Sequence, residues 1–172
     1  MSFNEQWNAF REVNERRRWK PATLKASDKE GWRILRRGIE EAMKQPLLAS
    51  SPLADSRDHL RVPASLTTQY RMNGRWVTSP LINLGEGGCF IATPECLDLG
   101  CPILLDISSE YALLTSIRAE VVWIRRPGEE GQAGMAVRFR QLEMTQRTML
   151  YSIIDRILYH FAIQEGSPRP MR

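Results

Sequence analysis

The chain has 172 residues, of which 42% are hydrophobic and 26% charged, with a net charge of +4, as expected for one globular domain plus extensions. The most apolar stretch, residues 149–161, is interrupted by Asp155 and Arg156, which excludes a membrane-spanning segment there. The N-terminus lacks the charged-then-apolar order of a signal peptide, so we expect a cytoplasmic protein.

The first elements predicted along the chain are two short amphipathic helices. One covers residues 3–19, where aromatic and aliphatic residues recur at helical spacing. The second is predicted to begin at a capping box with Ser27 as N-cap and Glu30 three residues on, and to end before Pro46. Each helix is too short to be stable alone. Residues 1–56 therefore form a helical segment and linker that must pack on the rest of the chain or on another copy.

The positive charge lies mainly in this N-terminal segment. The net charge, counted as Lys and Arg minus Asp and Glu, is +3 for residues 1–56, 0 for residues 57–142 and +1 for residues 143–172. Arg16–Arg18 form a basic cluster at the end of the first predicted helix. Such a cluster can bind nucleic acid or acidic lipid, but it is more often a solvated helix end, and we favour that interpretation.

From residue 57 the pattern becomes that of β-strands separated by turn residues. Strands are predicted at 62–71, 75–84, 88–93, 102–108, 112–125 and 133–140. No helical segment lies between them, and the middle of the chain is therefore predicted to be an antiparallel β-barrel or sandwich.

The first two strands are joined by Asn73-Gly74, the strongest short signal for a type I′ hairpin. With this turn, paired residues have numbers that add to 147, which places Arg61 opposite Glu86. Pro80 cannot donate to a ladder, so a bulge there would move this register by one. The hairpin brings Arg57 and Arg61 beside the glycine-rich turn Gly85–Gly88, whose backbone N–H groups suit an anion.

A third helix is predicted over residues 145–164, in the C-terminal segment 143–172. Its apolar face is broader than a surface helix needs and comprises Leu150, Ile153, Ile154, Ile157, Leu158 and Phe161. This helix closes one mouth of the barrel, pairs with a partner subunit, or does both.

Cysteine and histidine give no sign of a metal site. The chain has an odd number of cysteines, Cys89, Cys96 and Cys101, and they form no C-x-x-C pair. Its two histidines, His59 and His160, are far apart in the sequence. A zinc site needs about four such ligands at recurring spacings. We expect no metal, no cofactor, and thiols that are small buried hydrophobes in a reducing compartment.

The segment 57–142 resembles the PilZ domain, a bacterial receptor module for the second messenger cyclic di-GMP. The family signature is R-x-x-x-R followed, one hairpin later, by D/N-x-S-x-x-G. This chain has Arg57-Asp58-His59-Leu60-Arg61 and Asn83-Leu84-Gly85-Glu86-Gly87-Gly88, and residues 119–123 and 134–139 are similar to the family's late strands. The resemblance implies a mainly β fold: a barrel of about six antiparallel strands, here with an N-terminal helical extension and a C-terminal amphipathic helix.

The resemblance also implies the ligand-binding residues. Arg57 and Arg61 would bind the guanines and phosphates, since a guanidinium pairs with phosphate, donates to guanine and stacks on a purine. Asn83 would hydrogen-bond a guanine edge, and Gly88 would adopt a positive φ and approach the ligand closely. Gly85 replaces the family's serine, and the lost hydroxyl is worth roughly 0.5–1.5 kcal/mol, or about tenfold in affinity at most.

By this resemblance the chain is a non-catalytic receptor. Ligand binding would change helix docking or oligomer state and so signal to an unidentified protein partner. The alternative is a degenerate PilZ-like domain that binds no nucleotide and acts as a protein-interaction scaffold. No constellation of catalytic residues indicates an enzyme. A nucleic-acid-binding barrel is disfavoured because residues 57–142 are neutral and Trp123 lies in an apolar run expected in the core.

Overall fold

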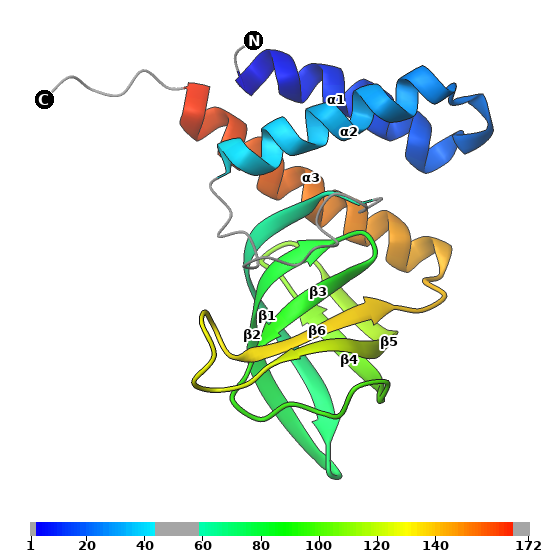
Figure 1. Cartoon of the computed structure of the whole chain (residues 1–172). Coiled ribbons are helices and arrows are strands. Elements are labelled where there is room, and N and C mark those ends of the chain that lie inside the picture. The colour runs from blue at the N-terminus through cyan, green and yellow to red at the C-terminus, as the bar shows by residue number, and fades with distance from the viewer. Residues whose placement is uncertain (1–2, 44–58, 167–172) are drawn as a thin grey trace, which may run out of the picture.

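The computed structural model describes residues 3–43 and 59–166 (Figure 1). Its elements in chain order are α1 (Phe3–Trp19), a short 3-10 helix (Pro21–Thr23), α2 (Ala26–Ala42), β1 (Arg61–Met72), β2 (Arg75–Gly85), β3 (Gly88–Ala92), β4 (Pro102–Ser108), β5 (Leu113–Arg125), β6 (Gly134–Phe139) and α3 (Met144–Gly166).

The six strands form a closed antiparallel barrel in the order β1-β2-β3-β6-β5-β4, with β4 pairing back onto β1. Alternate residues point inward and exclude water, as the burial of Leu84, Ile91, Leu105 and Ile117 shows. The predicted antiparallel barrel, with helices before and after it in the chain, is confirmed.

The hairpin of β1 and β2 follows the predicted register only in its outer part. Asn73 and Gly74 both have positive φ, as a type I′ turn requires, and pairs add to 147 from the turn as far as Leu66 opposite Leu81. The ladder then shifts between Pro63 and Leu66, beginning at a proline that has no N–H to donate. Arg61 therefore pairs with Gly85, and the predicted pairing with Glu86 is wrong.

The second helix also begins differently from the prediction. Ser27 is not its N-cap, because α2 already includes Ala26. The Asp28 carboxylate, in the first turn, accepts a hydrogen bond from the Lys25 backbone N–H at 3.0 Å. Asp28 thus plays the part that the prediction gave to Glu30.

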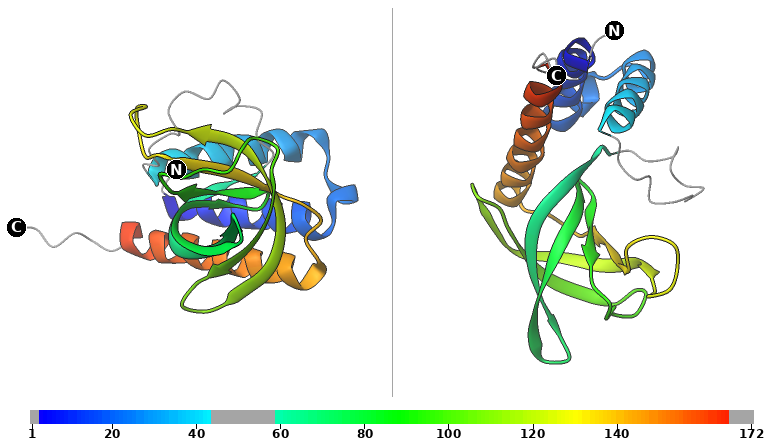
Figure 2. Two further views of the ribbon diagram at one scale, coloured as in Figure 1. Left: turned by 90° about the horizontal axis from the view of Figure 1, so that it is seen from below. Right: turned by 90° about the vertical axis from the view of Figure 1, so that its left-hand side faces the viewer.

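The three helices gather at one end of the barrel (Figures 1 and 2). The apolar face of α3 packs against β1 and β5, and α1 and α2 lie together beyond it, with α1 in contact with both other helices. Leu150, Ile154 and Leu158 of α3 are fully buried in a core cluster shared with the barrel. The N-terminal helices therefore pack on this chain itself. None of the helices among the described residues is long and apolar enough to cross a membrane.

Candidate functional site

The predicted ligand-binding residues lie at the barrel end that faces the helices, where β1 begins and β2 turns into β3. Arg61, Asn83, Gly85 and Gly88 belong to this region. Arg57 lies outside the described residues, so its predicted role stays a prediction. The β2–β3 connection is a tight turn of two residues, Glu86 and Gly87, between the paired Gly85 and Gly88.

The barrel register places four of these strand residues side by side. Arg61 pairs with Gly85, Gly85 with Gly88, and Gly88 with Arg138 of β6. The next row, which includes Val62, Leu84 and Val137, is buried inside the barrel, so the row of Arg61 and Arg138 faces outward. Two arginines thus flank a strip of two glycines, of which Gly85 is buried and Gly88 half-buried, and guanidinium groups suit an anion.

Asn83 belongs to the next outward-facing row. It pairs with Pro63 on one side and Phe90 on the other, and Phe90 in turn pairs with Ala136. Asn83 is only 9% exposed, which means that its amide lies in a sheltered position beside the glycine strip.

Glycine at position 85 is required by a close approach of two strands. A Cβ there would lie 2.9 Å from the Leu60 carbonyl oxygen and 3.2 Å from Cγ of Arg61. A serine would therefore force the segment that enters β1 to move. The departure from the family signature is a structural feature of this chain as well as the loss of a hydroxyl.

Gly88 is needed for a reason other than the predicted one. Its φ is not in the left-handed range, so the predicted positive φ is wrong. Instead, a Cβ on Gly88 would lie 2.1 Å from the Val137 carbonyl oxygen of β6. Glycine here lets β3 and β6 approach, and the barrel end closes as a result.

His59, in the middle of the R-x-x-x-R segment, contacts the turn directly. Its ring lies over Gly87, where a Cβ would meet the ring Cδ2 at 2.9 Å. Its Nδ1 is 3.3 Å from Oε2 of Glu86. The described part of the arginine segment and the glycine turn therefore meet, as the hairpin geometry predicts.

Glu86, in the turn itself, is the most strongly held acid of the site. Its side chain is 3% exposed and its carboxylate accepts hydrogen bonds from Arg17 and, at 2.6 Å, from Nε of Arg18. Burial raises the pKa of this carboxyl, but His59, Arg17 and Arg18 outweigh burial and hold the pKa at about 2. Glu86 is thus a charged carboxylate that faces α1.

The arginine cluster at the end of α1 is not the solvated helix end that the sequence favours. The Arg18 side chain is 3% exposed, and its Nη1 donates to both carboxylate oxygens of Asp155 in α3 at 2.9 Å. Burial lowers the pKa of Arg18, but the carboxylates of Glu86 and Asp155 outweigh it and raise the pKa above its usual value. Burial raises the pKa of Asp155 despite this pairing. The interpretation fails because tertiary packing brings two acids to the cluster.

Sequence reasoning missed four residues of this region: Arg17, Arg18, His59 and Arg138. Arg138 lies in one of the segments similar to the PilZ family. Pairing Gly88 with β6 identifies Arg138 as its neighbour. Its Nη2 lies 4.0 Å from Oε1 of Glu120 on the neighbouring strand. For Arg17 and Arg18 the only signal was the basic cluster itself.

Trp123 is a further correction. It is 38% exposed on the outside of β5, stacked beneath the Arg125 guanidinium, whose Cζ is 4.8 Å from the ring centroid. The expected core position is wrong because a register shift between Val121 and Trp123 turns the indole outward.

Metal-binding chemistry finds no support in the part of the chain that the structure describes, where no three His, Cys, Asp or Glu side chains gather around a common point. Cys89 is buried, and burial raises the pKa of its thiol far above the usual range. Cys96 and Cys101 are partly buried free thiols.

Comparison with known proteins identifies a family. The family model described as PilZ domain matches residues 55–156, more than half of the chain. No match was found among the curated proteins.

Solved structures with the same fold include YcgR of Escherichia coli in complex with c-di-GMP, at 17% identity and a TM-score of 0.55 over 63% of this chain. The match covers 48% of that YcgR chain, so our chain spans about half its length. The YcgR PilZ domain with c-di-GMP is 16% identical with a TM-score of 0.52, covering 65% of this chain and 98% of that one. The MrkH–c-di-GMP complex of K. pneumonia is 16% identical with a TM-score of 0.54, covering 63% and 55%.

Proposed function

Because the chain belongs to the PilZ domain family, we propose that it is a cytoplasmic bacterial receptor for cyclic di-GMP without catalytic activity. The observation that carries this proposal is the outward-facing row of Arg61, Gly85, Gly88 and Arg138 beside the His59-bearing segment. It brings two guanidinium groups beside a glycine turn, which suits a ligand with two phosphates and two purines.

Each part of this site matches a part of the ligand. A guanidinium pairs with phosphate in a forked geometry and also donates to O6 and N7 of guanine, so Arg61 and Arg138 would bind from opposite sides of the glycine strip. Arg57, four residues before Arg61, would reach the ligand from the segment that precedes β1. The sheltered amide of Asn83 would hydrogen-bond a guanine edge.

The output of the receptor would be a change in helix docking or oligomer state that a protein partner detects. The segment that carries Arg57 and Arg61 leads directly from the N-terminal helices into β1. A ligand bound by this segment therefore acts on the helices as well as on β1. A solution scattering profile that stays the same on saturation with ligand would argue against a change of this kind.

Calorimetry with cyclic di-GMP tests the receptor function. We expect wild type to bind, and Arg57→Ala, Arg61→Ala and Arg138→Ala each to lose about 10- to 100-fold in affinity, as for hydrogen bonds to charged groups. The matched control is Arg75→Ala at the far hairpin tip, which should bind like wild type. Equal affinity in all five proteins would place the ligand elsewhere.

One observation favours the alternative, a PilZ-like scaffold that binds no nucleotide. The approach of Leu60 to Gly85 leaves no space for the family's serine in this arrangement. Under this alternative, wild type shows no heat of binding at high micromolar cyclic di-GMP. Salt-dependent binding of single-stranded RNA by the same protein would favour a nucleic-acid-binding barrel instead.

A further inference from the structure

The α1–α2 hairpin is a packed unit of its own. Trp7, Phe10 and Trp32 stack with ring centroids 5.9 and 6.0 Å apart, and Asn14 accepts a hydrogen bond from the Trp32 indole at 3.0 Å. The same Asn14 oxygen accepts from the Arg17 guanidinium at 3.0 and 3.1 Å. The interior of the hairpin therefore fixes the direction in which Arg17 points.

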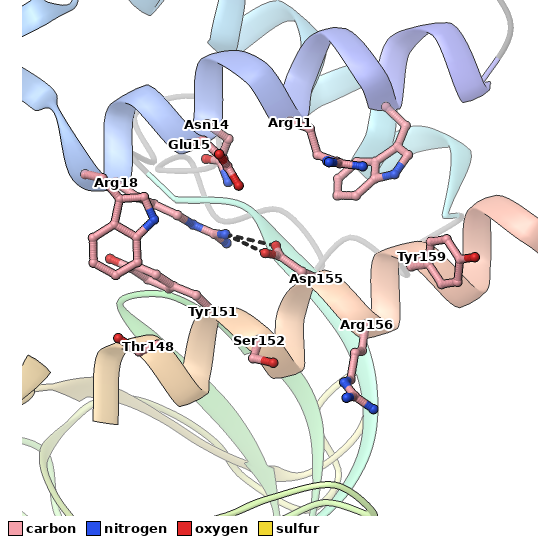
Figure 3. A pocket seen from close by; sticks show the side chains of 12 residues that line it. Arg11, Asn14, Glu15, Arg18, Thr148, Tyr151, Ser152, Asp155, Arg156 and Tyr159 are labelled. Atoms are coloured by element: carbon pink, nitrogen blue, oxygen red, sulfur yellow. Dashed lines mark hydrogen bonds and ion pairs between the residues drawn. The ribbon is translucent and has the colours of Figure 1, made fainter. Parts of the chain in front are cut away.

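The contact between α1 and α3 is open and polar by comparison. A cleft of about 440 Å³ lies between the two helices, and Arg18 of α1 points across it to Asp155 of α3 (Figure 3). The guanidinium of Arg18 also lies over the Tyr151 ring, 4.2 Å from its centroid. Charged contacts thus lie at this interface beside the edge-to-face contact of Trp19 with Tyr151.

The α1–α2 hairpin also contacts both the glycine turn and the start of β1, the two parts of the candidate ligand site. Arg17 and Arg18 bind Glu86 in the glycine turn, and Oε1 of Glu40 in α2 accepts a hydrogen bond from the Arg61 backbone N–H at 3.2 Å. His59 and Arg17 share the same Glu86 oxygen. The end of α1 is therefore a direct neighbour of the R-x-x-x-R segment.

The charges determine whether the ligand strengthens or weakens the contact between α1 and the glycine turn. At the glycine turn two guanidinium groups, those of Arg17 and Arg18, face one charged carboxylate, that of Glu86, so the net charge there is positive. A ligand with two phosphates bound at this turn adds negative charge beside it. In a partly buried site this attraction is much stronger than in water. The ligand should therefore strengthen the hold on α1.

On the basis of the proposed function, we propose that Arg17 and the buried Arg18 behind it place positive charge beside the cyclic di-GMP site, positioned by Glu86, and that the ligand locks the α1–α2 hairpin onto the barrel. Docking and ligand binding are then positively coupled, and each raises the equilibrium constant of the other by the same factor. The signalling output is a more rigidly held helical layer at this barrel end.

The docking is measured as a distance between two spin labels. Glu12→Cys on α1 and Leu99→Cys on the barrel place labels at exposed positions, with Cys96 and Cys101 changed to serine and the buried Cys89 left in place. Without ligand, the labels should show one docked distance in buffer and a broader distribution in urea below the unfolding transition, where local openings become more populated. Cyclic di-GMP should restore the narrow distribution at the same urea concentration.

Charge variants test the role of each residue. Glu86→Gln should broaden the distribution without ligand, and Arg17→Gln/Arg18→Gln should do the same and lower cyclic di-GMP affinity about 5-fold or more. Arg17→Lys/Arg18→Lys keeps the charge and should recover part of both effects. The matched control is Arg16→Gln, because Arg16 pairs with Asp28 of α2 and not with the barrel. Thermal unfolding checks that each variant is folded.

Two results would overturn the inference. In one, calorimetry shows that wild type binds cyclic di-GMP, but in urea the ligand leaves the distribution of label distances as broad as before or broadens it further. The receptor function then stands and the locking does not. In the other, Glu86→Gln keeps the docked distance of wild type, which shows that this carboxylate does not position α1. If neither wild type nor any variant binds cyclic di-GMP, the proposed function fails as well, whatever the label distances are.

Discussion

The interior of the barrel and the interface between the barrel and the N-terminal helices are held together by different forces. Inside the barrel, apolar residues of all six strands, such as Leu84, Ile91 and Leu105, exclude water completely or nearly so. At the interface, Glu86 meets Arg17 and Arg18, and Arg18 meets Asp155, beside an open cleft. Apolar burial does not depend on pH, whereas the free energy of an ion pair does, because its acid can be protonated. The barrel is therefore a fixed scaffold, and the helix interface can respond to a charged ligand.

The largest expected effect is in the barrel interior. Leu105→Ala removes a fully buried side chain from the core and should lower the free energy of unfolding by about 2–5 kcal/mol. Urea unfolding at low salt and in about 1 M NaCl should give the same loss, because no charge is involved. A loss below about 1 kcal/mol would mean that the barrel interior relaxes to fill the space.

The interface should lose stability in acid. The pKa of Glu86 is about 2 in the folded protein, against a usual value of about 4.5. Its contribution, on the order of 3 kcal/mol, is therefore complete above about pH 4.5 and disappears as the pH falls towards 2. Urea unfolding of wild type and Glu86→Gln across this range checks it.

The control for the acid experiment is the difference between those two proteins. Asp155 has a raised pKa and titrates in the opposite sense, and the charge of Glu86 is one cause of that rise. The difference curve should therefore report the titration of Glu86 together with its coupling to Asp155. Parallel curves would show that this carboxylate adds no pH-dependent stability.

Restoring the family's serine should be destabilising at the junction of the two regions. In Gly85→Ser the new Cβ meets the Leu60 carbonyl oxygen, and the strain should lower the free energy of unfolding by about 1–3 kcal/mol. Gly31→Ser in α2 is the matched control, since a Cβ there meets nothing within 4 Å. It should stabilise slightly, by up to about 0.5 kcal/mol, because serine is the better helix former. Equal stability of Gly85→Ser and wild type would show that the β1 entry adapts freely.

The smallest effect should come from an ion pair on the solvent-exposed face of α2. Arg33 and Glu30 lie 3.5 Å apart with side chains 50% and 58% exposed. Arg33→Ala should change the free energy of unfolding by less than about 0.5 kcal/mol. Arg18→Ala, measured beside it, should cost several times more. A similar cost for both would show that burial adds nothing to the interface pairs.

The barrel could be predicted from the sequence because its signals are local. Alternation of apolar residues gives the strands, and Asn73-Gly74 gives the first hairpin and its outer register. The meeting of the R-x-x-x-R segment with the glycine turn follows from that hairpin. Asn73 has its positive φ because of its own side chain and its glycine neighbour, whatever the rest of the chain does.

The errors came where long-range packing decides. Pro63 allows a shift because it has no N–H to donate, but nothing in the sequence shows that the shift occurs there, so the hairpin count pairs Arg61 with Glu86 where the structure pairs it with Gly85. The sequence predicts that Gly88 serves a turn, but the strand that it must pass closely, β6, begins 46 residues later. The place of Arg138 beside it depends on the same long-range pairing.

By itself, the sequence determined the six strands, the three helices and the proximity of arginine to a glycine turn, because these follow from side-chain periodicity and turn chemistry within a few residues. Only the tertiary structure decided that Arg17 and Arg18 are buried partners of Glu86. Ion pairs across 69 and 68 residues depend on how α1 docks, and that docking leaves no periodic signal in the chain.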